Sequence, residues 1–191
     1  HPTALPSNRG RHPIIWAIVL GLRETASTFF FMDEGADTGD ILSQESVRID
    51  EYDNANILYQ KLIKTALKQI ESFVNQLESK TFKRISQSNL KSNSWRKRGV
   101  EDGKIDWRMS SVNIWRLVKA LSKPYVGAHF NYEGKIIKVW EVEIIKKSYM
   151  NFEPGKVLKS NPDGVIIKTG DFAIKLVKIS PNIELSKGLY L

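Results

Sequence analysis

Hydrophobic and polar positions in the first 50 residues predict a short helix and two strands. Pro13 suits the first turn of a helix, because its missing N–H would have no partner there, and the apolar run Ile14 to Leu20 continues that helix to Gly21. Residues 26–32 are apolar and rich in β-forming types, which indicates a buried strand, and residues 41–49 predict a second one. This alternation of helix and strand favours an α/β layer.

A longer amphipathic pattern follows over residues 55–77. Asp53 and Asn54 can cap the start of this helix. Apolar residues recur at three- and four-residue spacing, which predicts that one face packs against the sheet: Leu58, Leu62, Ala66, Ile70, Phe73 and Leu77. Lys61, Lys64 and Lys68 fall on other faces, where we expect solvated charges.

The chain beyond residue 80 changes character twice. Residues 81–104 are polar and rich in serine and lysine, so we expect a linker between a domain over residues 1–80 and a second domain over residues 105–191. The second domain would begin with a helix capped by Ser110 or Ser111. Turn sequences after Gly127 then separate five or six short strands, which suggests a small β-barrel.

Composition narrows the class of protein. The 191 residues include no cysteine, which excludes disulfides, thiolate metal sites and a cysteine nucleophile, and is compatible with a reducing cytosol. The longest apolar run, residues 13–22, is about half of the roughly 20 residues that span a bilayer, so we expect a cytoplasmic protein that does not enter the membrane. The chain begins at His1 without an initiator methionine, and we therefore expect it to be the C-terminal part of a longer polypeptide.

Charge is distributed unevenly along the chain. Residues 1–80 carry 8 Lys and Arg against 11 Asp and Glu, whereas the remainder carries 21 basic and 10 acidic residues, a net charge of +11. A basic second half indicates an anionic partner such as nucleic acid, phosphate or a sugar nucleotide. A lysine-rich solvated surface is an equally good explanation of the charge alone.

Candidate chemistry gathers in the first 40 residues. His1 lies on a proline-rich loop with Thr3 and Arg9, and histidine is the usual general acid or base near neutral pH. Residues 33–40 carry four carboxylates punctuated by Gly35 and Gly39. Their spacing does not match the calcium-loop pattern, which leaves a solvated turn or a carboxylate that orients a histidine.

Two stretches of the chain carry a family resemblance. The first reads His1-Pro-Thr3-x-Leu-Pro-x-x-Arg9-Gly10, and the second reads Met32-Asp33-x-Gly35-Ala36-Asp37-Thr-Gly-Asp-Ile. Together they resemble the 10-formyltetrahydrofolate-dependent formyltransferases. The resemblance implies the C-terminal part of a Rossmann-like formyltransferase domain, followed by a small OB-like β-barrel domain.

The same resemblance implies roles for individual residues. His1 matches the family's catalytic histidine and Asp37 its catalytic aspartate, while the family's asparagine would lie two positions before His1. Thr3 replaces the usual serine and keeps the hydroxyl. By resemblance, the loop residues Met32, Asp33, Gly35, Ala36 and Asp37 would bind the co-substrate 10-formyltetrahydrofolate, and Thr3, Arg9 and Gly10 would lie at the acceptor. No metal is required.

The acceptor of the formyl group is decided only weakly by the linker. Arg96 and Arg98, followed by Glu101-Asp102-Gly103, resemble the branch that formylates amino sugars on nucleotide carriers, and we expect Arg96 or Arg98 to lie near the acceptor's diphosphate. The basic second half favours the alternative, initiator methionyl-tRNA. A second alternative is a non-catalytic fragment whose basic barrel only binds, since this chain alone is expected to be inactive. By resemblance, a homodimer also remains open.

Overall fold

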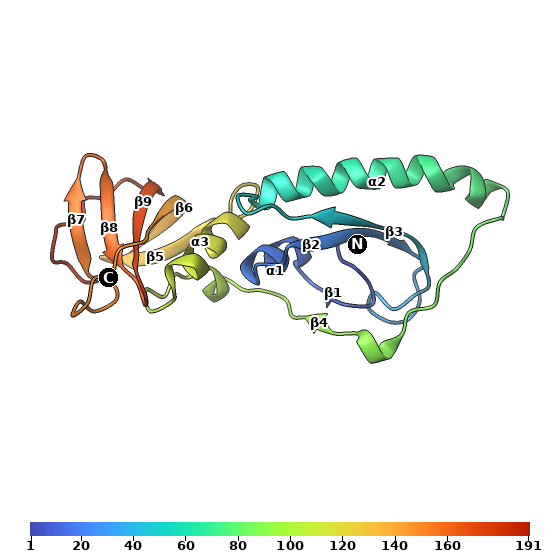
Figure 1. Cartoon of the computed structure of the whole chain (residues 1–191), viewed down its shortest axis with the longest axis horizontal. Coiled ribbons are helices and arrows are strands. Elements are labelled where there is room, and N and C mark those ends of the chain that lie inside the picture. The colour runs from blue at the N-terminus through green and yellow to red at the C-terminus, as the bar shows by residue number, and fades with distance from the viewer. The chain divides into compact units, whose positions relative to one another are not determined.

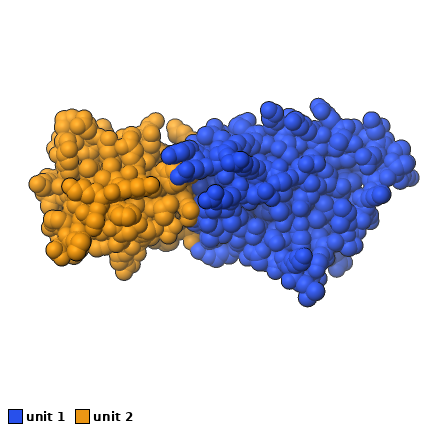
Figure 2. Space-filling model, in the orientation of Figure 1, with its two compact units in different colours: residues 1–98 blue, residues 99–191 orange.

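The structure, a computed structural model, describes every residue from His1 to Leu191. The chain folds into two compact units, His1–Arg98 and Gly99–Leu191, which are traced in Figure 1 and distinguished by colour in Figure 2. Both units contain a helix packed with strands, so the predicted α/β class is confirmed. None of the helices combines the length and hydrophobicity required to cross a membrane.

The first unit is built on a hairpin of two antiparallel strands, β2 (Glu24–Phe30) and β3 (Ile41–Arg48), which the acidic loop connects. The helix α1 (Pro13–Val19) precedes the hairpin, and its apolar residues are buried. The predicted helix and both strands are confirmed, although β2 lies two residues earlier than expected. The strand ends at Phe30 because the pairing becomes irregular there, and Met32 is already 91% exposed.

The long helix α2 (Ala55–Glu78) lies along the hairpin (Figure 1). Its start is fixed by Asn54, whose side-chain Oδ1 accepts a hydrogen bond from the Ile57 amide at 3.0 Å. Leu58, Leu62 and Phe73 are buried, and the Phe73 ring meets Phe29 of β2 edge-on at 5.0 Å. The predicted cap is therefore confirmed, and of the predicted packing residues three are buried while Ala66 and Leu77 are half-buried.

Ile70 was predicted on the same face, and this prediction is wrong. Ile70 is 40% exposed, whereas its neighbour Gln69 is buried and donates to the Ser27 carbonyl at 3.0 Å and to Ser43 Oγ at 2.9 Å. Successive helical residues lie about 100° apart, so burying Gln69 turns Ile70 to the flank. An apolar row remains exposed along α2, namely Tyr59, Ile63, Leu67, Ile70 and Val74.

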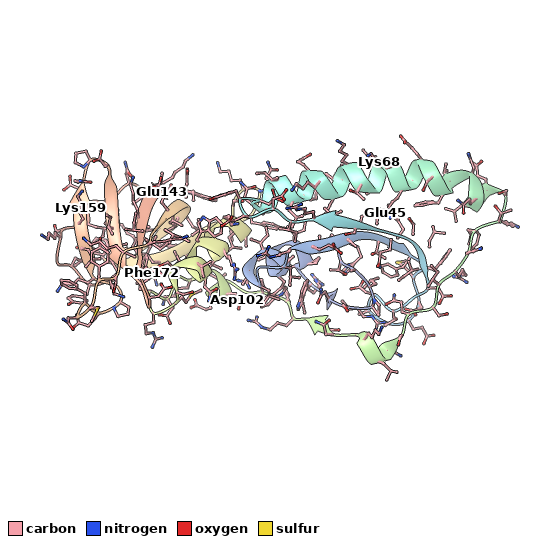
Figure 3. The ribbon with its side chains drawn as sticks, in the orientation of Figure 1. Glu45, Lys68, Asp102, Glu143, Lys159 and Phe172 are labelled. Carbon is pink, nitrogen blue, oxygen red and sulfur yellow. The ribbon has the colours of Figure 1, made fainter.

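The lysines of α2 differ from one another in their surroundings. Lys68 lies on the exposed surface of the helix, as predicted (Figure 3). Lys61 was also expected to be solvated, but its Nζ pairs with the carboxylates of Asp50 and Asp53 just before the helix. This pair ties the first turns of α2 to the end of β3.

Residues 81–98, here called the return segment, run back from α2 along the first unit (Figure 1). Ile85 bridges Ile41 at the start of β3. Further on, β4 (Ser94–Trp95) pairs in parallel with β1 (Arg9–Gly10). The boundary between the two compact units falls between Arg98 and Gly99, which lies within residues 81–104, where we expected a linker.

The second unit begins with η2 (Glu101–Gly103) and the helix α3 (Ser111–Ala120). Ser110 Oγ accepts from the Asn113 amide at 3.3 Å, which confirms the predicted cap. Asp171 adds a second cap, because its Oδ1 accepts from the Ser111 amide at 2.7 Å and from Ser111 Oγ at 2.9 Å. Five antiparallel strands follow: β5 (Ala128–Tyr132), β6 (Lys135–Ile145), β7 (Val157–Asn161), β8 (Gly164–Lys168) and β9 (Ala173–Ser180).

The five strands form an open sheet in the order β5-β6-β9-β8-β7. No ladder joins β5 to β7, so the closed barrel expected from the sequence is not confirmed. Other segments pair beside these two outer strands: Lys104 bridges His129 of β5, and Tyr190 bridges Lys156 just before β7. Closing the sheet would require the outer strands to pair with each other instead.

Candidate active site

His1 and Asp37 come together in the first unit. His1 Nε2 lies 3.5 Å from Asp37 Oδ2, and the two side chains are 12% and 21% exposed. This distance is within the range of an ion pair but is longer than a usual hydrogen bond. The two residues that the sequence singled out therefore lie side by side, and their roles stay a prediction.

Strand β2 anchors the loop that carries His1. The His1 backbone nitrogen donates to the Thr28 carbonyl at 2.7 Å, and the Thr28 amide donates back to the His1 carbonyl at 2.9 Å. Thr28 Oγ1 also donates to the Thr3 carbonyl at 2.6 Å. These bonds fix the backbone at His1 against a strand, so the ring position depends little on the loop itself.

The His1 ring has one nitrogen that the protein leaves unbonded. Its Nε2 is buried yet makes no hydrogen bond, because the contact to Asp37 is long and unfavourably directed. Phe30 packs edge-on against the ring, with centroids 6.3 Å apart. A buried imidazole nitrogen of this kind can donate to, or accept from, a reacting group.

Asp37 is held at both its side chain and its backbone. Oδ2 accepts from the Gly10 amide at 2.8 Å, and the Asp37 carbonyl accepts from Gln87 Nε2 at 3.0 Å. Its φ is +58°, in the left-handed region that non-glycine residues adopt only rarely. Gly39, two residues further along the loop, has no room for a side chain, since a Cβ there would lie 1.7 Å from the Phe31 carbonyl oxygen.

The other carboxylates of the acidic loop point elsewhere. Asp33 Oδ1 accepts from the Gly35 amide at 3.0 Å and from Thr38 Oγ1 at 2.6 Å, which closes a turn within the loop. Asp40 contacts Ser86 and Arg84 of the return segment. No group of three or more His, Asp or Glu side chains converges in the chain as a metal site.

The loop segment that the resemblance assigns to the co-substrate lies on the surface. The residues from Met32 to Ala36 are all exposed and lead directly into Asp37: Met32, Asp33, Glu34, Gly35 and Ala36. Just before them, Phe31 packs against Phe82 at 5.4 Å, and the Arg84 guanidinium lies 3.9 Å above the Phe31 ring. The return segment therefore supports the base of this loop.

The three residues expected at the acceptor differ in their contacts with His1 and Asp37: Thr3, Arg9 and Gly10. Gly10 contacts Asp37 directly through its backbone amide. Arg9 is 6% exposed, and its guanidinium donates to Gln87 and Asn89. Thr3 is fully buried, and its hydroxyl makes no hydrogen bond. The side chains of Thr3 and Arg9 are therefore both buried, and neither is exposed to an acceptor in this structure.

Gln87 is a site residue that the sequence analysis missed. It lies in the stretch that we assigned to a linker, yet its side chain joins Arg9 to the carbonyls of Asp37 and Gly39. The sequence around Gln87 is mostly polar and has no hydrophobic periodicity that would identify a packed position. The only signal was its polarity, which a surface position explains equally well.

Arg96 and Arg98 gather with two tryptophans at the end of the return segment. The Arg98 guanidinium lies 4.6 Å from the Trp16 ring and that of Arg96 lies 5.5 Å from it. Trp16 Nε1 donates to the Arg96 carbonyl at 3.1 Å, and the Trp95 ring lies 6.5 Å from that of Trp16. Arg98 is buried, whereas Arg96 is exposed, and Arg96 Nη1 donates to the Lys97 carbonyl at 3.1 Å.

The basic second half divides unevenly between the two units. The return segment carries six basic residues and no acidic one, whereas residues 99–191 carry 15 basic and 10 acidic residues. The return segment thus holds more than half of the excess positive charge beyond residue 80, although the whole first unit, with its acidic residues 1–80, has a net charge of +3 against +5 for the second unit.

Comparisons with known proteins agree across both units. A model of the family described as "Formyl transferase" matches residues 1–74, and one described as "Formyl transferase, C-terminal domain" matches residues 98–184. A methionyl-tRNA formyltransferase from Halothermothrix orenii is 36% identical over 184 residues, which are 94% of this chain and 58% of that protein. The bifunctional polymyxin resistance protein ArnA from Wigglesworthia glossinidia brevipalpis is 34% identical over 162 residues, which are 85% of this chain and 24% of that protein.

Solved structures share the fold. An N-formyltransferase from Helicobacter canadensis, solved in complex with folinic acid and dTDP-3-aminofucose, matches with a TM-score of 0.71 at 20% identity. The match covers 92% of this chain and 63% of that chain. The chain spans 58% to 60% of the length of two methionyl-tRNA formyltransferases to which it is similar.

Proposed function

This chain belongs to the formyl transferase family, and from that premise we propose that the protein carrying it transfers a formyl group from 10-formyltetrahydrofolate to a primary amine. The observation that carries the proposal is the pair of His1 and Asp37. The imidazole offers a buried nitrogen without a partner, and a carboxylate lies 3.5 Å from it. A family member that had lost the reaction would have no need to hold this geometry.

The reaction requires what these two groups can supply. The amine attacks the formyl carbon, and the tetrahedral intermediate carries an oxyanion that needs a preorganised donor. His1 Nε2, when protonated, donates to that oxyanion, and Asp37 stabilises the resulting positive charge. Asp37 accepts the amine proton, directly or through water, and N10 of tetrahydrofolate leaves with a proton as the formamide forms.

The co-substrate fits the loop from Met32 to Asp37. Asp33 satisfies the Gly35 amide within the loop, so the turn keeps its shape without a ligand. The loop residues directly before Asp37 are exposed. Such a loop suits a flat heterocycle that forms hydrogen bonds with peptide groups. We place the pterin of 10-formyltetrahydrofolate there, with the loop residues Met32, Asp33, Gly35 and Ala36 around it.

For the acceptor we propose an amino sugar on a nucleotide carrier. Arg96 and Arg98 place two guanidinium groups beside the Trp16 ring, in the same unit as the catalytic pair. Guanidinium forks suit a diphosphate. The concentration of positive charge in the return segment supports an anionic acceptor bound by the first unit.

Initiator methionyl-tRNA is the second candidate, and two observations favour it. The methionyl-tRNA formyltransferase of Halothermothrix orenii is similar to this chain over both units. The second unit also keeps an excess of positive charge, and a nucleic acid is held largely through such charge. In that case the second unit, which we take as an OB-like module after a Rossmann-like domain, would carry the acceptor's affinity.

A side-by-side assay of acceptors tests the proposal. The full protein is supplied with 10-formyltetrahydrofolate and either a set of nucleotide-linked amino sugars or methionyl-tRNA. Turnover of a sugar alone supports the proposed acceptor. Turnover of tRNA alone replaces the sugar with the second candidate. Turnover of neither, in a folded protein, contradicts both acceptors and favours the alternative of a module that binds.

A further inference from the structure

Gln87 has its whole side-chain amide engaged between two parts of the candidate active site. Nε2 donates to the Asp37 carbonyl at 3.0 Å and to the Gly39 carbonyl at 2.7 Å. Oε1 accepts from Arg9 Nε at 3.2 Å and from Arg9 Nη2 at 2.8 Å. A primary amide offers two N–H donors and one oxygen with two lone pairs, so every group of this side chain is used.

These contacts also fix which way the amide faces. Arg9 can only donate, so the atom that meets it is the oxygen, and the two carbonyls can only accept from the nitrogen. Arg9 is buried, and its guanidinium meets the neutral amides of Gln87 and Asn89. Its positive charge behind Oε1 polarises the Gln87 amide and strengthens the donation toward Asp37.

Asp37 needs such support because its backbone is unusual. Its φ of +58° turns the carbonyl in a direction that ordinary residues avoid. Gln87 holds that carbonyl, while the Gly10 amide holds the carboxylate at 2.8 Å. With both ends of the residue fixed, Oδ2 stays 3.5 Å from His1 Nε2.

We propose that Gln87 is a positioning residue for formyl transfer, which it serves by holding the left-handed backbone of Asp37 and hence the direction of the carboxylate toward His1. The proposal rests on the proposed function of that pair. Gln87 touches neither His1 nor the carboxylate, so its effect passes through the Asp37 carbonyl. The return segment is thereby part of the active site rather than a connection between units.

The substitution Gln87→Glu in the full protein tests the donor of the amide separately from its acceptor. A carboxylate keeps the acceptor that Arg9 requires but removes the donor to Asp37 and Gly39. We expect kcat to fall about 10- to 100-fold, with KM for both substrates within about threefold, because a small displacement of a catalytic group costs turnover more than binding. The control Asn89→Ala removes the other acceptor of Arg9 and leaves the Asp37 turn alone, so its kcat stays within about threefold.

A second measurement needs no turnover. In an NMR spectrum of the full protein, the Gly10 amide proton reports its bond to Asp37 Oδ2. Gln87→Glu should move this resonance upfield and speed its hydrogen exchange, whereas Asn89→Ala should not. If Gln87→Glu does not fold, Gln87→Met removes both halves of the amide at similar length and is judged by the same criteria.

The two measurements distinguish the proposals. A wild-type protein without formyl transfer overturns the proposed function, while the Gly10 resonance still shows whether Gln87 holds the Asp37 turn. An unchanged Gly10 resonance in Gln87→Glu overturns the positioning role, even if kcat falls. An unchanged kcat in an active enzyme overturns it as well, even if the resonance moves.

Discussion

The Gly10 amide donates to Asp37 Oδ2 at 2.8 Å, across 27 residues of chain. Gly10 can do so because β1 pairs closely with β4. A Cβ on Gly10 would lie 2.3 Å from the Trp95 carbonyl oxygen, so only glycine permits this approach. Its φ is +102°, which also excludes most side chains. The close approach of two short backbone segments thus aims a backbone donor at the carboxylate.

Gly10→Ala should therefore destabilise the first unit strongly. The added methyl group meets backbone rather than a flexible side chain, so β1 and β4 must separate, and we expect a loss of about 2–4 kcal/mol in the free energy of unfolding. Urea denaturation followed by tryptophan fluorescence measures it, since Trp16 and Trp95 lie close by. Gly99→Ala is the control: nothing lies within 4 Å of its added Cβ, and the change should stay within about 0.5 kcal/mol. Equal effects of the two substitutions would contradict the close-packing argument.

His129 predicts a pH dependence of stability in the second unit. Burial, and then the charge of Lys138, lowers the pKa of His129 below its ordinary value, with Lys104 acting the same way and Glu101 opposing. The unfolded chain then binds the proton more readily than the folded one. The free energy of unfolding should therefore decrease as the pH falls through about 6.5 toward the folded-state pKa, and be flat above that range.

Comparison with His129→Gln isolates this effect, because glutamine does not titrate. Urea denaturation of both proteins between pH 5 and pH 8 should show a steeper loss of stability toward acid in the wild type, whatever the offset between them. Parallel curves would show that His129 keeps its ordinary pKa.

Arg96 and Arg98 should affect the acceptor and not the folate. With a nucleotide-linked sugar as acceptor, Arg96→Ala and Arg98→Ala should each raise its KM about tenfold, because a charge-assisted contact to phosphate is lost. The KM for 10-formyltetrahydrofolate should stay within about twofold. Lys97→Ala, between them in sequence, is the matched control for net charge. If Lys97→Ala raised the acceptor's KM equally, the effect would be general charge rather than a diphosphate contact.

Much of the first unit could be predicted because its signals are local. The Asn54 cap, the apolar spacing of α2 and the position of Pro13 each act within one or two turns of chain. Ile70 was misplaced because the helix buries Gln69 for its bonds to Ser27 and Ser43, and hydrophobic spacing alone does not anticipate a buried amide.

The return segment could not be predicted for the opposite reason. It carries no periodic apolar pattern, and its partners lie far away in sequence: Asn93 Oδ1 accepts from the Asn8 amide at 2.8 Å across 85 residues. Gln87 likewise acts only through residues about 50 and 78 positions away. In the second unit the turns revealed the strands, but whether a sheet closes depends on edge pairing that turns do not encode.

The most direct measurement of the central claim is kcat for formyl transfer by the full protein and by Asp37→Asn, His1→Ala and the double variant. Asp37→Asn keeps an acceptor for the Gly10 amide but removes the charge beside His1. We predict that each single substitution lowers kcat about 10²- to 10⁴-fold and that the double variant is little worse than the more severe single one, since the two act as a unit. Glu34→Gln, on the same loop, should remain within about threefold. Turnover within a few-fold of normal in either single variant would contradict the assignment of His1 and Asp37 as the catalytic pair.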